Sequence, residues 1–94
     1  AATPDPYMIV RAGIMYERLG ESEKALEYYD TTQERVLETL AYYSKINRPF
    51  YRTREYVYPI RLLQRQYSQN GYDDRLQQLE QGLQAVDPQM LQMR

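Results

Sequence analysis

Apolar side chains recur along this chain every three or four residues, the spacing that places them on one face of an α-helix. Four segments show this spacing, at about 6–19, 22–46, 50–69 and 73–86. No segment shows a comparable alternation typical of a β-strand. The pattern therefore predicts an all-α fold of four helices. The predicted core positions are Ile9, Ala12, Gly13, Tyr16, Ala25, Tyr29, Val36, Leu40, Tyr43, Tyr56, Ile60, Leu63, Tyr67, Leu76, Leu79, Leu83 and Val86.

Proline and glycine residues indicate where these helices begin and end. Asp5 followed by Pro6 is typical of a helix start, and Gly20 and Gly71 are typical of helix ends. Pro59 lies inside the third predicted helix, so we expect either a kink there or a start delayed to that point. We expect the second and third helices each to exceed about 15 residues, which is above the average for globular proteins.

The two halves of the chain are related. Tyr16 and Gly20 recur 51 residues later as Tyr67 and Gly71. In the first half, "YERLGESEKALEYYD" resembles the tetratricopeptide repeat, and the second half is similar to it more weakly. The resemblance implies two antiparallel hairpins of an α-α superhelix, at 6–46 and 50–87. The matched repeat positions are Gly13, Tyr16, Gly20, Ala25, Tyr29, Tyr67, Gly71 and Pro88.

The period departs from that family. A tetratricopeptide repeat is about 34 residues long, so the spacing of this chain has an excess of about 17 residues. We interpret the excess as extra helix on both sides of the connection near 46–50, which would then form the exposed tip of a long hairpin.

A second resemblance concerns the middle of the chain. The motif "LAYYSKI" before the connection, with "LLQRQYSQNG" after it, is similar to the soluble C-terminal tail of a bacterial membrane-protein family related to the protein O-mannosyltransferases. This likeness implies an extracytoplasmic module, and without it a cytoplasmic location would be expected. We expect 1–94 to form one domain of a longer protein, with a linker edge at 1–5 and a tail at 88–94.

Composition argues against a catalytic domain. The chain contains no histidine and no cysteine, which removes the commonest general base and metal ligand and every thiolate. We therefore expect no enzyme activity, metal or cofactor in this domain. Its net charge of −1 also differs from the strong basic excess of most nucleic-acid-binding domains.

Basic residues are nevertheless concentrated in the middle of the chain. Residues 39–66 hold six basic residues and one acid, Glu55. Arginines of the third helix share a face opposite its apolar stripe, which is typical of either a solvated surface or a binding surface. An acidic stripe on the second helix offers partners at matching heights, Asp30 for Arg65 and Glu34 for Arg61, of which we expect at most one pair. The candidate partner-binding residues are Arg48, Phe50, Arg52, Arg54, Tyr58, Arg61 and Arg65.

These features favour a non-catalytic docking module whose partner is a protein or the rest of the same polypeptide. Two alternatives remain open. The domain could be only the structural tail of a membrane glycosyltransferase-like protein, with membrane contact through an upstream anchor. It could also bind anions or nucleic acid through Arg54, Arg61 and Arg65.

Overall fold

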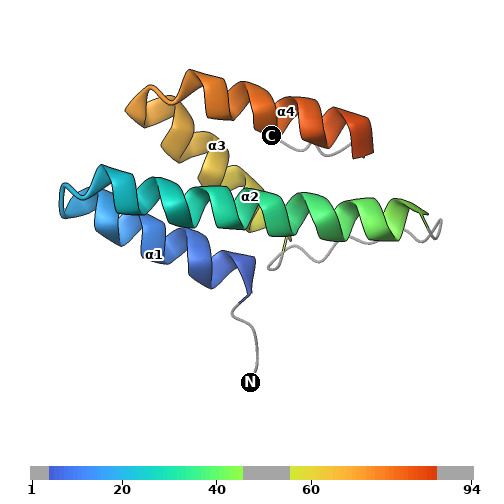
Figure 1. Cartoon of the computed structure of the whole chain (residues 1–94), viewed down its shortest axis with the longest axis horizontal. Coiled ribbons are helices and arrows are strands. Elements are labelled where there is room, and N and C mark those ends of the chain that lie inside the picture. Colours follow the sequence, from blue (N-terminus) through green and yellow to red (C-terminus); the bar gives the residue numbers. More distant parts are fainter. Residues whose placement is uncertain (1–4, 46–55, 87–94) are drawn as a thin grey trace.

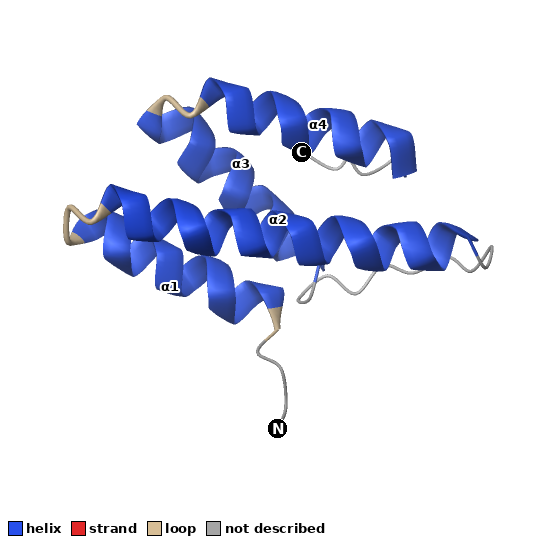
Figure 2. Ribbon diagram, viewed as in Figure 1, coloured by secondary structure: helices blue, strands red, loops and turns tan. Residues whose placement is uncertain are grey.

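The computed structural model of the chain describes residues 5–45 and 56–86 (Figure 1). The four elements are α1 (Pro6–Arg18), α2 (Ser22–Lys45), α3 (Tyr58–Asn70) and α4 (Asp73–Val86). Within those described ranges every regular element is helical, as Figure 2 shows. The predicted all-α fold of four helices is therefore confirmed.

The predicted helix boundaries are confirmed where local capping chemistry sets them. The Asp5 carboxylate accepts a 2.9 Å hydrogen bond from the backbone N–H of Met8, and Pro6 opens the first turn of α1. Gly20 and Gly71 follow α1 and α3 with φ angles of 81° and 74°. A left-handed backbone of this kind strains any residue with a Cβ, which explains glycine at both turns.

The third helix begins later than Phe50. It starts at Tyr58, with Pro59 in its first turn, so the delayed start is the alternative observed. Tyr56 and Val57 form a π-helical turn just before it. The α2 helix has 24 residues and α3 has 13, so elongation is seen in α2 and not in α3. The remainder of the predicted third helix and the predicted tip lie at 46–55, outside the described residues.

Consecutive helices are antiparallel and form two hairpins, α1–α2 and α3–α4, called here the first and second hairpins (Figure 1). The C-terminal part of α2 extends past the N-terminal end of α1. The α4 helix packs against this long helix as well as against α3. Two glycines allow close helix approach. A Cβ on Gly13 would lie 2.7 Å from the Tyr29 ring, and one on Gly82 would lie 2.7 Å from Leu37.

One core connects all four helices. Most predicted core positions are buried, and Ala12, Tyr16, Tyr56, Leu76 and Val86 are half-buried. The side chain of Tyr43 lies outside the described residues. The predicted stripes omitted four buried residues, which are Val10, Thr32, Val57 and Pro59. Thr32 is accommodated because its hydroxyl donates a 2.8 Å hydrogen bond to the Tyr28 carbonyl one turn earlier.

Candidate docking surface

The contact between the two hairpins is built around a pair of buried tyrosines. The rings of Tyr29 (α2) and Tyr67 (α3) meet edge to face, with centroids 5.9 Å apart. The Tyr67 hydroxyl donates a 2.9 Å hydrogen bond to Gln33, and the Tyr29 hydroxyl lies 3.5 Å from the Gln66 side-chain oxygen. Each hairpin thus supplies a glutamine that accepts from the other hairpin's tyrosine. Burial is the main cause that raises the pKa of both tyrosines.

Polar contacts border this aromatic centre. Arg75 of α4 donates two hydrogen bonds, of 2.8 and 3.2 Å, to the carboxylate of Asp30, and these bonds raise the pKa of Arg75. The Tyr72 hydroxyl lies 3.2 Å from both carboxylate oxygens of Glu17 in α1. Of the two pairings considered, Asp30 with Arg65 does not form, because the Asp30 carboxylate meets Arg75 instead. Asp30 thus faces α4.

The 51-residue relationship between the halves shows which surface of the first hairpin remains uncovered. In the second hairpin Pro59, Leu63, Tyr67 and Leu79 are all buried. The residues 51 positions earlier in the sequence lie on the first hairpin, and none of them is buried. The same side of the hairpin is therefore covered in one half of the molecule and open in the other. These corresponding residues are Met8, Ala12, Tyr16 and Tyr28.

Apolar side chains gather on this open side. Met8, Met15 and Leu19 lie along one side of α1 with 62%, 57% and 69% of their surfaces exposed. Beside them, the rings of Tyr16 and Tyr28 stack with centroids 5.3 Å apart. The Lys24 ammonium lies over the Tyr16 ring, 5.0 Å from its centroid. We call this set the outer face of the first hairpin: Met8, Ala12, Met15, Tyr16, Leu19, Lys24 and Tyr28.

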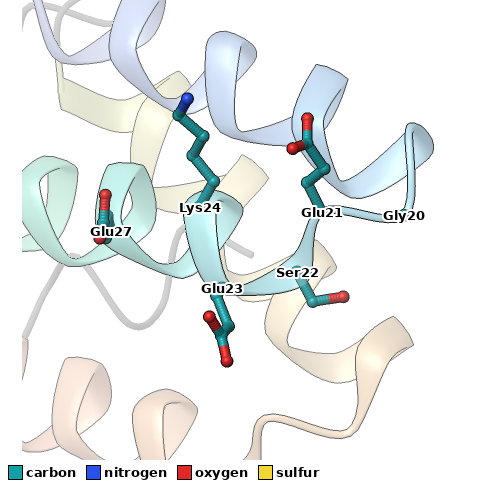
Figure 3. Close-up of a pocket in the computed structure, with 6 residues that line it drawn as sticks. All are labelled: Gly20, Glu21, Ser22, Glu23, Lys24 and Glu27. Carbon is teal, nitrogen blue, oxygen red and sulfur yellow. The ribbon is translucent and has the colours of Figure 1, made fainter.

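A shallow hollow of about 410 Å³ borders the outer face at the turn between α1 and α2. Figure 3 shows Lys24 and Glu21 pointing toward α1, whereas Glu23 points to the opposite side of α2. The hollow brings acidic side chains and one ammonium to the rim of the apolar surface. It is lined by Gly20, Glu21, Ser22, Glu23, Lys24 and Glu27.

The predicted partner-binding residues fall into two groups. Arg48, Phe50, Arg52 and Arg54 lie outside the described residues. The other three lie on α3, where Tyr58 is 47% exposed and contacts the Tyr7 ring at a centroid distance of 6.4 Å. The structure thus places Tyr58 beside α1. The remaining two, Arg61 and Arg65, are exposed.

The 51-residue relationship explains the positions of these arginines. Arg61 and Arg65 correspond to Val10 and Ile14 of α1, which face the core. The second hairpin therefore carries charge where the first carries the apolar residues that support its neighbour. A polar outer surface of this kind is how stacks of helical repeats end in water.

The outer face was missed by the sequence analysis, which assigned one apolar stripe to α1 and left the other apolar residues of that helix unassigned. A signal was present, because Met8, Met15 and Leu19 share one side of α1 at helical spacing. An apolar residue on a second side of a helix indicates a second contact. Only the fold shows that the described residues leave this second side of α1 exposed.

No family model, no curated protein and no solved structure matches this chain. The structure shows a small domain of four helices. Its likeness to known families rests on the residue patterns alone. Among the helices that the structure describes, none combines the length and apolar character needed to cross a membrane.

Proposed function

We propose that this chain is a non-catalytic protein-docking module of the tetratricopeptide-like class, and that it binds its partner through the outer face of the first hairpin. The observation that carries the proposal is the exposure of Met8, Met15 and Leu19 on a side of the hairpin that is buried in the second half of the molecule. Contiguous exposed apolar side chains of this size mark interaction surfaces.

The composition of the outer face supports protein recognition. Methionine side chains adapt to irregular partner surfaces, and tyrosines supply large contact area with little loss of conformational entropy. Arg11 and Arg18, exposed on α1, flank the apolar residues and supply a polar rim. The hollows of this surface are shallow and solvent-open, which suits a helix or a protein segment better than an enclosed small molecule.

The partner is a separate protein or another part of the same polypeptide. The resemblance of "LAYYSKI" and its surroundings to a membrane-protein tail favours the second source, in an extracytoplasmic setting. In that case the remainder of the membrane protein would supply the surface that covers Met8 and Met15. Both sources require the same apolar contact, so one experiment tests the shared proposal.

The test compares the wild-type chain with a Met8→Asp/Met15→Asp variant as bait in extract of the source organism. Both positions are exposed, so we expect the variant to fold normally by circular dichroism and to lose proteins that wild type retains. The matched control is Gln77→Asp/Gln81→Asp, which adds the same charge at exposed positions of α4. Identical retention by all three baits would refute the proposed function.

A further inference from the structure

The contact between the two hairpins provides a template for what the outer face binds. Lys24 of the first hairpin corresponds to Arg75 of the second, and Tyr16 corresponds to Tyr67, each 51 residues apart. In the second hairpin, both Arg75 and Tyr67 already have partners. A cation and a phenol therefore stand at the same sequence spacing on the open face as on the covered one.

The partners of Arg75 and Tyr67 lie on one helix. Arg75 meets the carboxylate of Asp30, and the Tyr67 hydroxyl donates to the side-chain oxygen of Gln33. Asp30 and Gln33 are three residues apart on α2, so they stand one above the other on the same side of that helix. Tyr29 and Val36 are fully buried beside them and supply the apolar part of the contact.

We propose that the partner of the outer face is an amphipathic helix that carries a carboxylate and, three residues later, a carboxamide, beside an apolar stripe. The carboxylate pairs with Lys24 and the carboxamide accepts from the Tyr16 hydroxyl, while apolar side chains cover Met8 and Met15. This inference rests on the proposed function, because it names the chemistry of the partner for the same surface.

The charges around the outer face are mixed. Arg11 and Arg18 are exposed on α1, whereas Glu21, Glu23 and Glu27 border Lys24 at the hollow, so Lys24 alone specifies the partner's carboxylate. One position differs from the template, because Glu21 stands where the second hairpin has Tyr72, which contacts Glu17. The partner should therefore present a base or a hydroxyl at that corner in place of a second carboxylate.

A second copy of this chain does not meet these requirements. The exposed end of its second hairpin has Arg61 and Arg65 at the positions of Val10 and Ile14, and Gln81 at the position of Asp30. Head-to-tail stacking would therefore place arginines near Arg11 and Arg18 and would offer no carboxylate to Lys24. The occupant is a helix of different sequence.

The experiment uses a synthetic peptide of residues 25–40, held helical by a side-chain staple between positions 27 and 31, which are exposed in α2. This probe carries the Asp30 and Gln33 side chains that the template uses. It is titrated into the full chain with backbone NMR shifts as the readout. We expect the shift changes to cluster on the outer face.

A charge exchange decides the assignment. Lys24→Glu in the chain should weaken binding of the peptide by roughly threefold to tenfold, and a peptide with Asp30→Lys should restore it. Lys45→Glu makes the same charge change at an exposed site at the far end of α2 and should leave the affinity unchanged. Tyr16→Phe should also weaken binding, since it removes only the hydroxyl.

The outcomes separate the two claims. Shifts on the outer face that ignore the Lys24→Glu exchange would overturn the assigned chemistry and leave apolar docking intact. Absence of peptide binding would overturn the inferred partner helix. Concentration-dependent self-association of the chain alone would also overturn it, and would identify a second copy as the occupant of the outer face. The extract experiment with Met8→Asp/Met15→Asp tests the docking function independently of the peptide.

Discussion

Tyr67, which is fully buried in α3, donates a 2.9 Å hydrogen bond to Gln33 of α2 across the contact between the hairpins. The two residues lie 34 positions apart, so this bond fixes the second hairpin on the first. Its length lies within the ordinary range for a neutral O–H···O hydrogen bond, and it sits at the edge of an apolar core.

Tyr67→Phe should lower the free energy of unfolding by about 1 kcal/mol, because it removes the hydroxyl and keeps the ring. Chemical denaturation of the two proteins measures the difference. Tyr58→Phe is the matched control, since Tyr58 is nearly half exposed, and it should change stability by less than about 0.5 kcal/mol. Equal effects of both substitutions would show that the bond to Gln33 contributes nothing.

Alkaline pH should destabilise the fold through Tyr29 and Tyr67. Burial is the largest cause that raises both pKa values above the ordinary 10.0. The next cause is the negative charge of Glu17 for Tyr29 and of Asp30 for Tyr67. Well below pH 10 both hydroxyls are protonated in the folded and unfolded states. Above it the unfolded chain releases these protons first, so stability falls as pH rises toward the folded pKa values.

This loss is measured by denaturation midpoints between about pH 8 and about pH 11. A Tyr29→Phe/Tyr67→Phe variant should show a shallower decline over the same range, because the two shifted groups are gone. A decline of the same steepness in this variant would assign the alkaline sensitivity to other groups.

Gly13→Ala should destabilise the first hairpin by roughly 1–3 kcal/mol, because the new Cβ would lie 2.7 and 2.9 Å from two atoms of the Tyr29 ring. The ring is fully buried and cannot move aside. Gly82→Ala is an informative comparison, since its Cβ would meet the terminal methyl groups of half-buried Leu37, which can rotate. Thermal unfolding should therefore show a larger loss for Gly13→Ala than for Gly82→Ala.

Arg61→Val/Arg65→Ile should make the chain associate with itself. These substitutions place on α3 the residues that α1 has at the corresponding positions, Val10 and Ile14, and so replace a charged end with an apolar one. Sedimentation of the variant over a range of concentrations should show oligomers that wild type lacks. An additional Met15→Asp should reduce them if the new surface meets the outer face of another copy.

The same arginines separate the docking proposal from anion binding. We expect wild type and the Arg61→Val/Arg65→Ile variant to show equally weak, salt-sensitive binding to single-stranded nucleic acid by fluorescence anisotropy. Strong binding by wild type that the variant loses would instead favour a nucleic-acid-binding function for the α3 face.

Local chemistry made the helices predictable, whereas contacts between hairpins did not follow from single-helix patterns. The positions of Asp5, Gly20 and Gly71 were sufficient to locate helix ends, because each acts on its own neighbours in the chain. The contact of Asp30 with Arg75 was not anticipated, because the matching heights of the second and third helices do not show where the fourth helix packs. The outer face was missed for the same reason, because a residue's exposure depends on whether another hairpin covers it.

The substitution of Val10 and Ile14 by Arg61 and Arg65 in the second hairpin has a consequence for stoichiometry. Under the docking proposal, one end of the stacking axis presents a surface that binds a helix, and the described part of the opposite end is charged. We therefore expect the chain to be monovalent along this axis, with one partner per copy in its complexes, so that it ends an array of helices and does not extend one.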